Sequence, residues 1–175
     1  MKFRFWICSA LVIGAMSSTM MAEEKKTTLG IQNVRIDGYV GNRINNSIAN
    51  ITMPVDIDLL VQPFRTQDET QNRWQCEFWG KWVQGAIASY RYHVDDTLYE
   101  KIEKSVTLMI ALQLPNGYIG NYDKEHQLQG WDVWGRKYTT LGFLKWYDLT
   151  GDKKALDAAC RLIDYTITQL GPSAT

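Results

Sequence analysis

The chain has 175 residues, with 19 basic and 19 acidic side chains and a formal net charge of zero. This balance does not favour a protein that binds nucleic acid or docks on anionic lipid. The length leaves room for one domain with a modest core. Seven Trp, nine Tyr and five Phe are many for a chain of this size, so we expect some of these rings to bind a ligand.

The start of the chain has the pattern of a secretory signal peptide. Lys2 and Arg4 precede an apolar run from Phe5 to Met16, and small residues follow. The run is too short for a stable membrane span, although an uncleaved anchor is the alternative. Cleavage after Ala22 or after Ser17 fits the pattern. We expect an exported protein, periplasmic or extracellular, that has no membrane contact after cleavage and keeps 17 basic and 19 acidic residues.

Four segments have the hydrophobic periodicity of helices, and they are of two kinds. Segments 97–113 and 153–170 have one apolar stripe opposite a charged face, which predicts helices with one side in water. Segments 77–92 and 132–149 carry apolar side chains around most of their circumference, which predicts packing on most sides. Each unit thus pairs an inner helix, packed on most sides, with an outer helix that has one side in water. The apolar stripes of the outer helices are Leu98, Ile102, Val106 and Met109 in the first, and Leu156, Ala159, Leu162, Ile163 and Ile167 in the second.

An offset of 57 residues relates the two pairs of segments. The aligned pairs include Gly85 with Gly142, Tyr90 with Tyr147, and Asp95 with Asp152. A fixed period with helical patterning indicates stacked helix–turn–helix units.

The connections between these segments alternate between short and long. Short turns at 93–96 and 150–152 join the helices within a unit, and Gly151 and Asp152 are suited to end one helix and cap the next. The loop at 114–131, between units, is long. Tight turns on one face and long loops on the other predict an all-α toroid of helical hairpins with a cleft on the long-loop face.

Three stretches carry a family resemblance: KWVQGAIASY at 81–90, LPNGYIGNY at 114–122, and WDVWGRKYTTLGFLKWYDLTGD at 131–152. Together they resemble the N-terminal part of the catalytic domain of β-L-arabinofuranosidases of glycoside hydrolase family 127 and its neighbour family 146. The resemblance covers roughly 31–172. It implies an (α/α)6 toroid and retaining hydrolysis by a zinc-bound cysteine thiolate, with a glutamate as acid/base.

The catalytic groups that the resemblance implies do not map onto this chain. In the family they come from later helices, whereas Cys76 stands alone before the first inner helix and Cys160 lies on an outer one. A thiolate–zinc site needs several converging soft ligands. We therefore expect no catalytic residue and no metal ligand here, zinc only in the complete family domain, and two semi-buried, apolar cysteines. Trp131 and Tyr138 replace sugar-contacting histidines of the family, which indicates a divergent subgroup.

Eight residues on the long-loop face are the candidates for substrate binding. A sugar site combines an aromatic plate for the apolar face of the ring with carboxylate, amide or basic groups around its polar rim. The candidates are Glu77, Trp79, Tyr118, Trp131, Asp132, Trp134, Arg136 and Lys137.

Each candidate also has an explanation without a ligand. The three Trp side chains can pack in the wall of the toroid. Asp132 can stabilise the start of a helix, and Arg136 or Lys137 can pair with Glu77 or Asp132 across neighbouring inner helices. Glu77 and Asp132 can also be a glycosidase carboxylate pair, which requires a separation of about 5–5.5 Å for retention or about 6.5–9.5 Å for inversion.

The expected organisation is a signal peptide at 1–22, an extended segment at 23–42, and a partial toroid catalytic domain at 43–175, truncated at its C-terminal end. The favoured function is the N-terminal portion of a secreted glycoside hydrolase that removes terminal arabinofuranosyl or related sugars from plant glycans. Its expected partners are the carbohydrate and the downstream part of the same domain. The alternative is a non-catalytic carbohydrate-binding or helical-repeat scaffold protein, which the missing nucleophile, acid and metal ligands favour.

Overall fold

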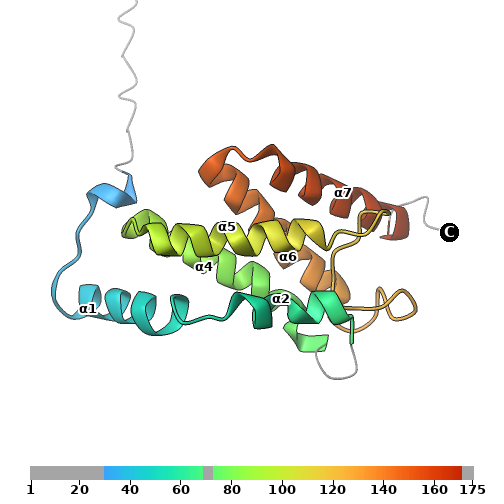
Figure 1. The fold of residues 1–175 in the computed structure, drawn as a ribbon, viewed down its shortest axis with the longest axis horizontal. Helices are drawn as coiled ribbons and strands as arrows, with labels where there is room; N and C mark the ends of the chain where they lie inside the picture. Colours follow the sequence, from blue (N-terminus) through green and yellow to red (C-terminus); the bar gives the residue numbers. More distant parts are fainter. Residues whose placement is uncertain (1–29, 69–72, 171–175) are drawn as a thin grey trace, which may run out of the picture.

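The computed structural model describes residues 30–68 and 73–170, and all regular secondary structure in these ranges is helical (Figure 1). The all-α prediction is confirmed. The predicted signal peptide lies outside the described residues, and no described helix is both long and apolar enough for a membrane span. The helices are η1 (Ile31–Asn33), α1 (Gly38–Ser47), η2 (Ile48–Thr52), α2 (Ile57–Thr66), η3 (Arg73–Glu77), α4 (Phe78–Tyr92), α5 (Asp96–Ala111), α6 (Asp132–Thr150) and α7 (Lys153–Leu170).

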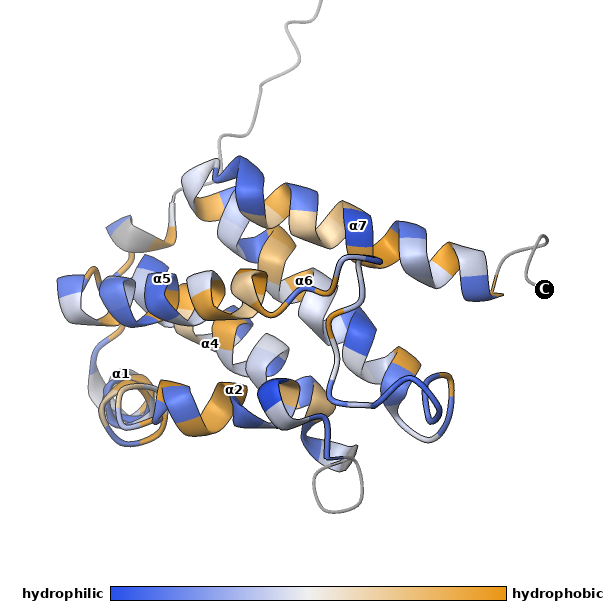
Figure 2. Cartoon of the chain, turned by 45° about the vertical axis from the view of Figure 1, so that its right-hand side comes forward, coloured by the Kyte–Doolittle hydropathy of each residue, from blue (hydrophilic) through white to orange (hydrophobic). Residues whose placement is uncertain are grey.

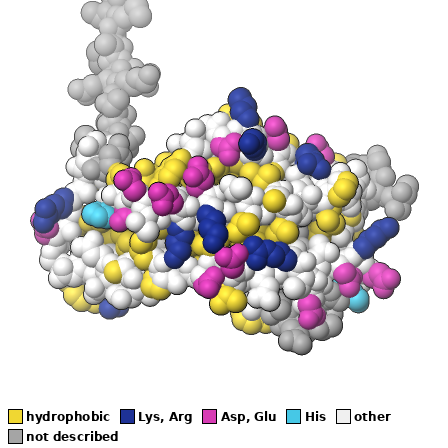
Figure 3. All heavy atoms as spheres, viewed as in Figure 1, with side chains coloured by type: hydrophobic (Ala, Val, Ile, Leu, Met, Phe, Trp, Pro, Cys, Tyr) yellow, Lys and Arg dark blue, Asp and Glu magenta, His cyan; other side chains and the backbone are white. Residues whose placement is uncertain are grey.

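The N-terminal helices α1, η2 and α2 follow one another along one side of the α4–α5 hairpin (Figure 1). Helix α1 begins at Gly38, so residues 38–42 are helical, although the sequence predicted an extended segment up to 42. Gly41 is the only buried residue of this helix, and the helix has few apolar side chains. Helix α2 contacts α5. Figure 3 shows acidic and basic side chains intermixed on the face that carries these helices.

Two helical hairpins, α4–α5 and α6–α7, follow at the positions that the sequence predicted. Equivalent aspartates begin the second helix of each hairpin. The Asp95 carboxylate accepts a hydrogen bond from the Leu98 N–H at 2.8 Å, and the Asp152 carboxylate accepts one from the Lys154 N–H at 2.9 Å. Gly151 has a φ of 75° and ends α6 in the left-handed conformation, as predicted.

The inner helices α4 and α6 run parallel and pack closely through glycines. Gly80 of α4 lies against the backbone of Tyr138 on α6, because a Cβ atom at position 80 would come within 2.1 Å of the Tyr138 carbonyl oxygen. Near their other ends, Arg91 of α4 and Asp148 of α6 form a salt bridge of 2.8 Å. The core lies between these helices and their outer partners. There the buried Trp79 ring packs on the Phe143 ring, with the ring centroids 4.9 Å apart.

The outer helices have one buried side each, and hydrophilic and hydrophobic residues alternate along α5 and α7 (Figure 2). All four residues of the predicted α5 stripe are buried. On α7, Ala159 and Leu162 are buried as predicted, but Ile163 is 40% exposed and Ile167 is 56% exposed. The stripe of α7 is wider than the surface that α5 and α6 cover.

The inner helices are also more exposed than their apolar circumference predicts. Phe78 of α4 and Trp134, Leu141 and Leu144 of α6 are each more than a third exposed. Packing on most sides is therefore not seen within the described residues. Closure of the hairpins into a six-hairpin toroid remains a prediction, since the described chain has two such hairpins and the preceding helices.

Candidate functional site

The close packing of α4 and α6 brings together the two segments that begin these helices. Gly135, in the first turn of α6, lies against Cys76 at the end of η3, where a Cβ atom would come within 2.5 Å of the Cys76 Cβ. The Cys76 thiol donates a hydrogen bond to the Trp131 carbonyl at 3.3 Å. The end of η3 and the start of α6 are therefore in direct contact.

A pocket of about 330 Å³ opens above this contact, between η3–α4 and the start of α6. On one side Trp74 and Phe78 make an edge-to-face pair with ring centroids 5.1 Å apart. On the other side Trp131 and Trp134 make a second such pair at 6.5 Å. All four rings are partly exposed, so the pocket offers aromatic surface from both sides.

Glu77 places a carboxylate in this aromatic surround. It forms a salt bridge of 2.6 Å with Lys81 and accepts a hydrogen bond from the Trp134 indole N–H. Burial raises the pKa of Glu77, but the hydrogen bonds from Lys81 and Trp134 outweigh it and hold the pKa below its usual range. Glu77 is thus an ionised hydrogen-bond acceptor, and it is unsuited to donate a proton as a general acid at neutral pH.

The charges at the start of α6 lie in a buried network behind the pocket. The Asp132 carboxylate accepts hydrogen bonds from the Tyr118 hydroxyl at 2.7 Å, from the Leu128 N–H at 2.8 Å and from the Arg136 guanidinium at 2.5 Å. Burial, together with the charge of Asp132 and the hydrogen bond to it, raises the pKa of Tyr118, so its hydroxyl stays a donor. The network therefore holds the loop before α6 against the helix.

Arg136 extends the network to α7. Its guanidinium donates to the Gln169 side chain at 2.6 Å and lies over the rings of Tyr118 and Tyr165, at 4.8 and 5.4 Å from their centroids. The Tyr165 hydroxyl donates to the Gln127 side chain at 2.6 Å. Loop, α6 and α7 are thus joined by polar side chains with little access to water.

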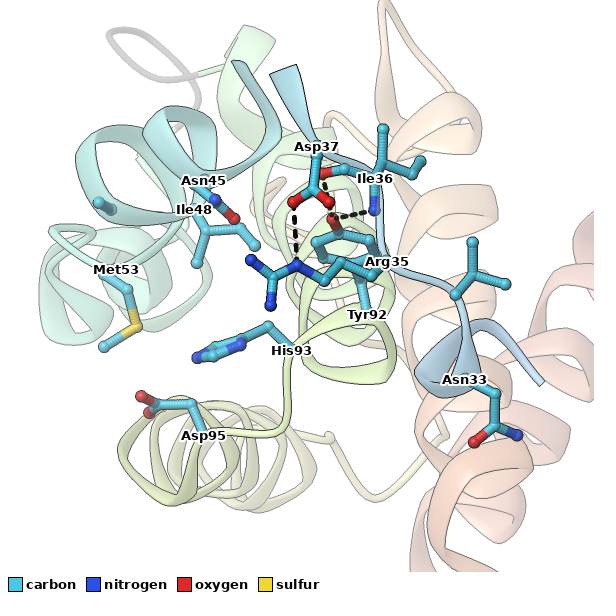
Figure 4. A pocket seen from close by; sticks show the side chains of 12 residues that line it. Asn33, Arg35, Ile36, Asp37, Asn45, Ile48, Met53, Tyr92, His93 and Asp95 are labelled. Carbon is cyan, nitrogen blue, oxygen red and sulfur yellow. Dashed lines mark hydrogen bonds and ion pairs between the residues drawn. The ribbon is translucent and has the colours of Figure 1, made fainter. Parts of the chain in front are cut away.

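A larger cavity, of about 700 Å³, lies elsewhere, between the N-terminal segment and the α4–α5 turn (Figure 4). Its charged groups are largely used within the chain: Arg35 and Asp37 form a salt bridge of 2.9 Å, and their side chains are 87% and 76% exposed. Tyr92 hydrogen-bonds the backbone of Ile36. We prefer the smaller pocket as the candidate site because it combines facing aromatic rings with a held carboxylate.

Comparison with known proteins agrees with a glycosidase domain. The family model for the β-L-arabinofuranosidase GH127 catalytic domain matches residues 10–175. The chain belongs to this family. Searches of curated proteins and of solved structures gave no match. The predicted resemblance to the N-terminal part of the GH127 catalytic domain is confirmed.

The structure divides the eight predicted GH127 site residues into two groups. Trp131 and Trp134 are 56% and 43% exposed and line the pocket with Glu77. Lys137 is exposed beside them and lies over the Trp134 ring, 3.3 Å from its centroid. The other four residues are at most 2% exposed and offer a sugar no surface in this structure: Trp79, Tyr118, Asp132 and Arg136. Trp79 packs in the core, and the other three belong to the buried network.

Several of the explanations without a ligand hold in part. Arg136 does pair with Asp132, but along α6 rather than across helices. Glu77 pairs with Lys81 of its own helix. The carboxylates of Glu77 and Asp132, the alternative glycosidase pair, are thus both bound by cations and hydrogen-bond donors of the chain itself. Asp132 also has almost no contact with solvent. The arrangement does not favour Glu77 and Asp132 as a catalytic pair.

The eight candidates did not include the wall of the pocket that precedes α4. Trp74, Phe78 and Lys81 line the pocket but were not among the eight candidates. A signal for Trp74 was present, because it stands 57 residues before Trp131, the same offset that relates the two hairpins.

The zinc-bound thiolate that the resemblance implies finds no fitting set of ligands among the described residues. No three His, Cys, Asp or Glu side chains converge within the described ranges. Cys76 is buried as an apolar side chain, and burial raises its pKa to about 12, which disfavours the thiolate. Cys160 is exposed on α7, not semi-buried as predicted, and both are free thiols. We assign no zinc chemistry to these residues.

Proposed function

We propose that the chain is the N-terminal portion of a secreted glycoside hydrolase that removes terminal arabinofuranosyl or related sugars from plant glycans. The observation that carries the proposal is the match to the GH127 catalytic domain over residues 10–175. The pocket between α4 and α6 supports it, since aromatic rings around a carboxylate suit the apolar face and the hydroxyl rim of a sugar. Export rests on the signal-like pattern at 1–22.

In this proposal Glu77, Trp131 and Trp134, with Lys137 at the rim, bind the carbohydrate. The groups that break the glycosidic bond, and the zinc that the family implies, belong to the downstream part of the same domain. Glu77 is held ionised by Lys81 and Trp134, so its role is to accept hydrogen bonds from the sugar rather than to protonate it.

The exposed edge of the α6–α7 hairpin supports a partner that continues the helical stack. Ile87 of α4 and Val106 of α5 are each 1% exposed. Their equivalents, 57 residues later, are Leu144 and Ile163, which are 39% and 40% exposed. An apolar edge of this kind favours a contact with another element. The proposed occupant is a further helical hairpin from the downstream part of the domain.

The test of the proposed function is hydrolysis by the complete reading frame. We expect the purified protein to release L-arabinose from β-L-arabinofuranosides, as measured by chromatography of the released sugar. A folded protein that releases no sugar from any such substrate would refute the proposal. A protein that binds these glycans without hydrolysing them would instead support the non-catalytic carbohydrate-binding alternative, which the ion pairing of Glu77 and Asp132 favours.

A further inference from the structure

We propose that the pocket between α4 and α6 is a two-walled site that holds one neutral sugar ring between aromatic side chains from two successive repeats. Trp74 and Phe78 form the second wall, opposite Trp131 and Trp134. The inference rests on the proposed function only in taking the ligand to be a carbohydrate. It adds Trp74, Phe78 and Lys81 to the binding residues and defines the class of sugar.

The internal repeat accounts for the two walls. Trp74 and Trp131 are 57 residues apart, and each comes shortly before an inner helix. Because α4 and α6 are parallel and in direct contact, equivalent positions at their starts lie side by side. The two indoles are also equally accessible, with exposed fractions of 55% for Trp74 and 56% for Trp131. One repeated residue thus supplies both sides of one pocket.

The size and the rings of the pocket suit a single sugar ring. A volume of about 330 Å³ lies at the low end of ligand pockets, which range from roughly 300 to 1,000 Å³. Each wall is an edge-to-face pair rather than a flat stack, so the two rings of a wall meet at an angle. The Trp134 indole N–H is already donated to Glu77, and this ring therefore offers apolar surface rather than a polar atom.

The polar groups of the pocket form a neutral pair. Glu77 and Lys81 are joined by a salt bridge of 2.6 Å, and both line the pocket. The carboxylate retains lone pairs that can accept hydrogen bonds, and the ammonium retains N–H groups that can donate them. Neighbouring hydroxyls of a sugar ring both donate and accept, so they match this pair. A uronic acid would bring a negative charge to a pair whose cation is already neutralised, and the further cation, Lys137 at the rim, lies over the rings of Trp134 and Tyr138 rather than in the lining of the pocket.

The experiment is an NMR titration of the full chain, following the Trp indole signals. The probes are methyl β-L-arabinofuranoside as the neutral sugar and galacturonic acid as the charged one. We expect the neutral sugar to bind and the acid to bind no more tightly. Trp74→Ala and Trp131→Ala should each weaken binding at least about tenfold, which corresponds to ~1.4 kcal/mol. Trp74→Phe keeps an aromatic plate and should stay within about threefold of the unmodified chain.

A matched control is Tyr39→Ala, because Tyr39 is a 77% exposed ring on α1, away from the pocket. It should leave affinity unchanged. Circular dichroism checks that each variant is folded. If Trp74→Ala does not fold, Trp74→Leu, which removes the ring but keeps an apolar side chain, takes its place, and unchanged affinity in that variant would count against the inference.

Three outcomes would overturn the inference. Affinity unchanged in Trp74→Ala but lost in Trp131→Ala would leave a one-walled site, and the proposed hydrolase function would stand. Tighter binding of galacturonic acid would contradict the neutral pair. Absence of binding by the unmodified chain would remove the sugar site, while the hydrolysis assay on the complete reading frame would still decide the proposed function independently.

Discussion

Two glycines of α4, five positions apart, provide a sharp test of the packing that builds the pocket. In Gly80→Ala, the new methyl group would lie 2.1 Å from the Tyr138 carbonyl oxygen and 2.4 Å from its carbonyl carbon. These atoms belong to the backbone of α6, so they cannot move aside by a change of rotamer. In Gly85→Ala, the methyl group meets no atom within 4 Å. The same chemical change therefore has opposite consequences at the two positions.

Both substitutions gain helix propensity, about 1 kcal/mol relative to glycine. At position 85 this gain is unopposed, and we expect the free energy of unfolding to rise by about 0.5–1 kcal/mol. At position 80 the inner helices must separate by more than an ångström to reach an ordinary contact. Overpacking of this kind typically costs about 1–3 kcal/mol and sometimes more. After the gain in helix propensity is subtracted, we expect Gly80→Ala to be destabilised by about 2 kcal/mol, or by more where the backbone of α6 cannot shift.

Urea denaturation, followed by circular dichroism, measures both variants against the unmodified chain. A shift of the midpoint to higher urea for Gly85→Ala and to lower urea for Gly80→Ala would support the close α4–α6 contact. The affinity for a neutral sugar should also fall in Gly80→Ala, because the two walls of the pocket belong to the helices that are forced apart. If Gly80→Ala is as stable as Gly85→Ala, the helices do not meet through Gly80, and the pocket loses its structural basis.

Three further predictions concern charge and burial. Arg136→Met leaves a buried carboxylate without its cation and should lower the free energy of unfolding by about 3–5 kcal/mol. Arg91→Met breaks an exposed pair and should cost less than about 1 kcal/mol, so equal losses in urea denaturation would contradict the difference in burial. Alkylation at pH 8, followed by peptide mass spectrometry, should modify the exposed Cys160 well before Cys76, because burial raises the pKa of Cys76 to about 12. Equal rates of alkylation would refute the burial of Cys76. Because the pKa of Glu77 is lowered in the folded state, its ionised form stabilises the fold above about pH 4.5. The difference in free energy of unfolding between the unmodified chain and Glu77→Gln should therefore be constant above that pH and shrink as the pH falls further. Growth of that difference on acidification would count against the salt bridge.

The hairpins could be predicted from the sequence because their signals are local. The start of α7 follows from a glycine that adopts a left-handed conformation and an aspartate that caps the next helix, and both are visible in Thr150-Gly151-Asp152. The single stripe of α5 was likewise sufficient to identify its buried residues. Helix α1 was missed because it is short, has few apolar side chains and buries only Gly41, so its sequence does not stand out from a polar loop.

The candidate site was harder to predict because residue type does not show which side of a helix start is covered. Asp132 and Arg136 have the chemistry of a sugar site, yet a loop that precedes the helix by up to 20 residues folds over them. That fold-back depends on tertiary contacts of Tyr118, which no local pattern reveals. Trp74, in a short 3-10 helix before α4, was not among the eight candidates, although it lies on the long-loop face that the sequence predicted.

The buried network also explains why Asp132 and Arg136 stand at the start of α6 although neither of them needs to touch a sugar. The loop at 112–131 has no regular helix, so its polar groups require partners from elsewhere in the chain. Asp132 and Arg136 supply these partners. Within the same loop, the Tyr122 hydroxyl accepts a hydrogen bond from the Trp131 N–H at 3.0 Å, while the Cys76 thiol donates to the Trp131 carbonyl.

The backbone of Trp131 is therefore fixed on both sides by side chains that are themselves buried. A direct role of Asp132 or Arg136 in sugar binding would require these hydrogen bonds to break and a buried ion pair to separate, at a cost of several kcal/mol. Monosaccharide binding in the millimolar range supplies only about 4 kcal/mol in total. The network is thus too costly to open for a ligand, and its contribution to recognition is to hold the exposed indole of Trp131 in place.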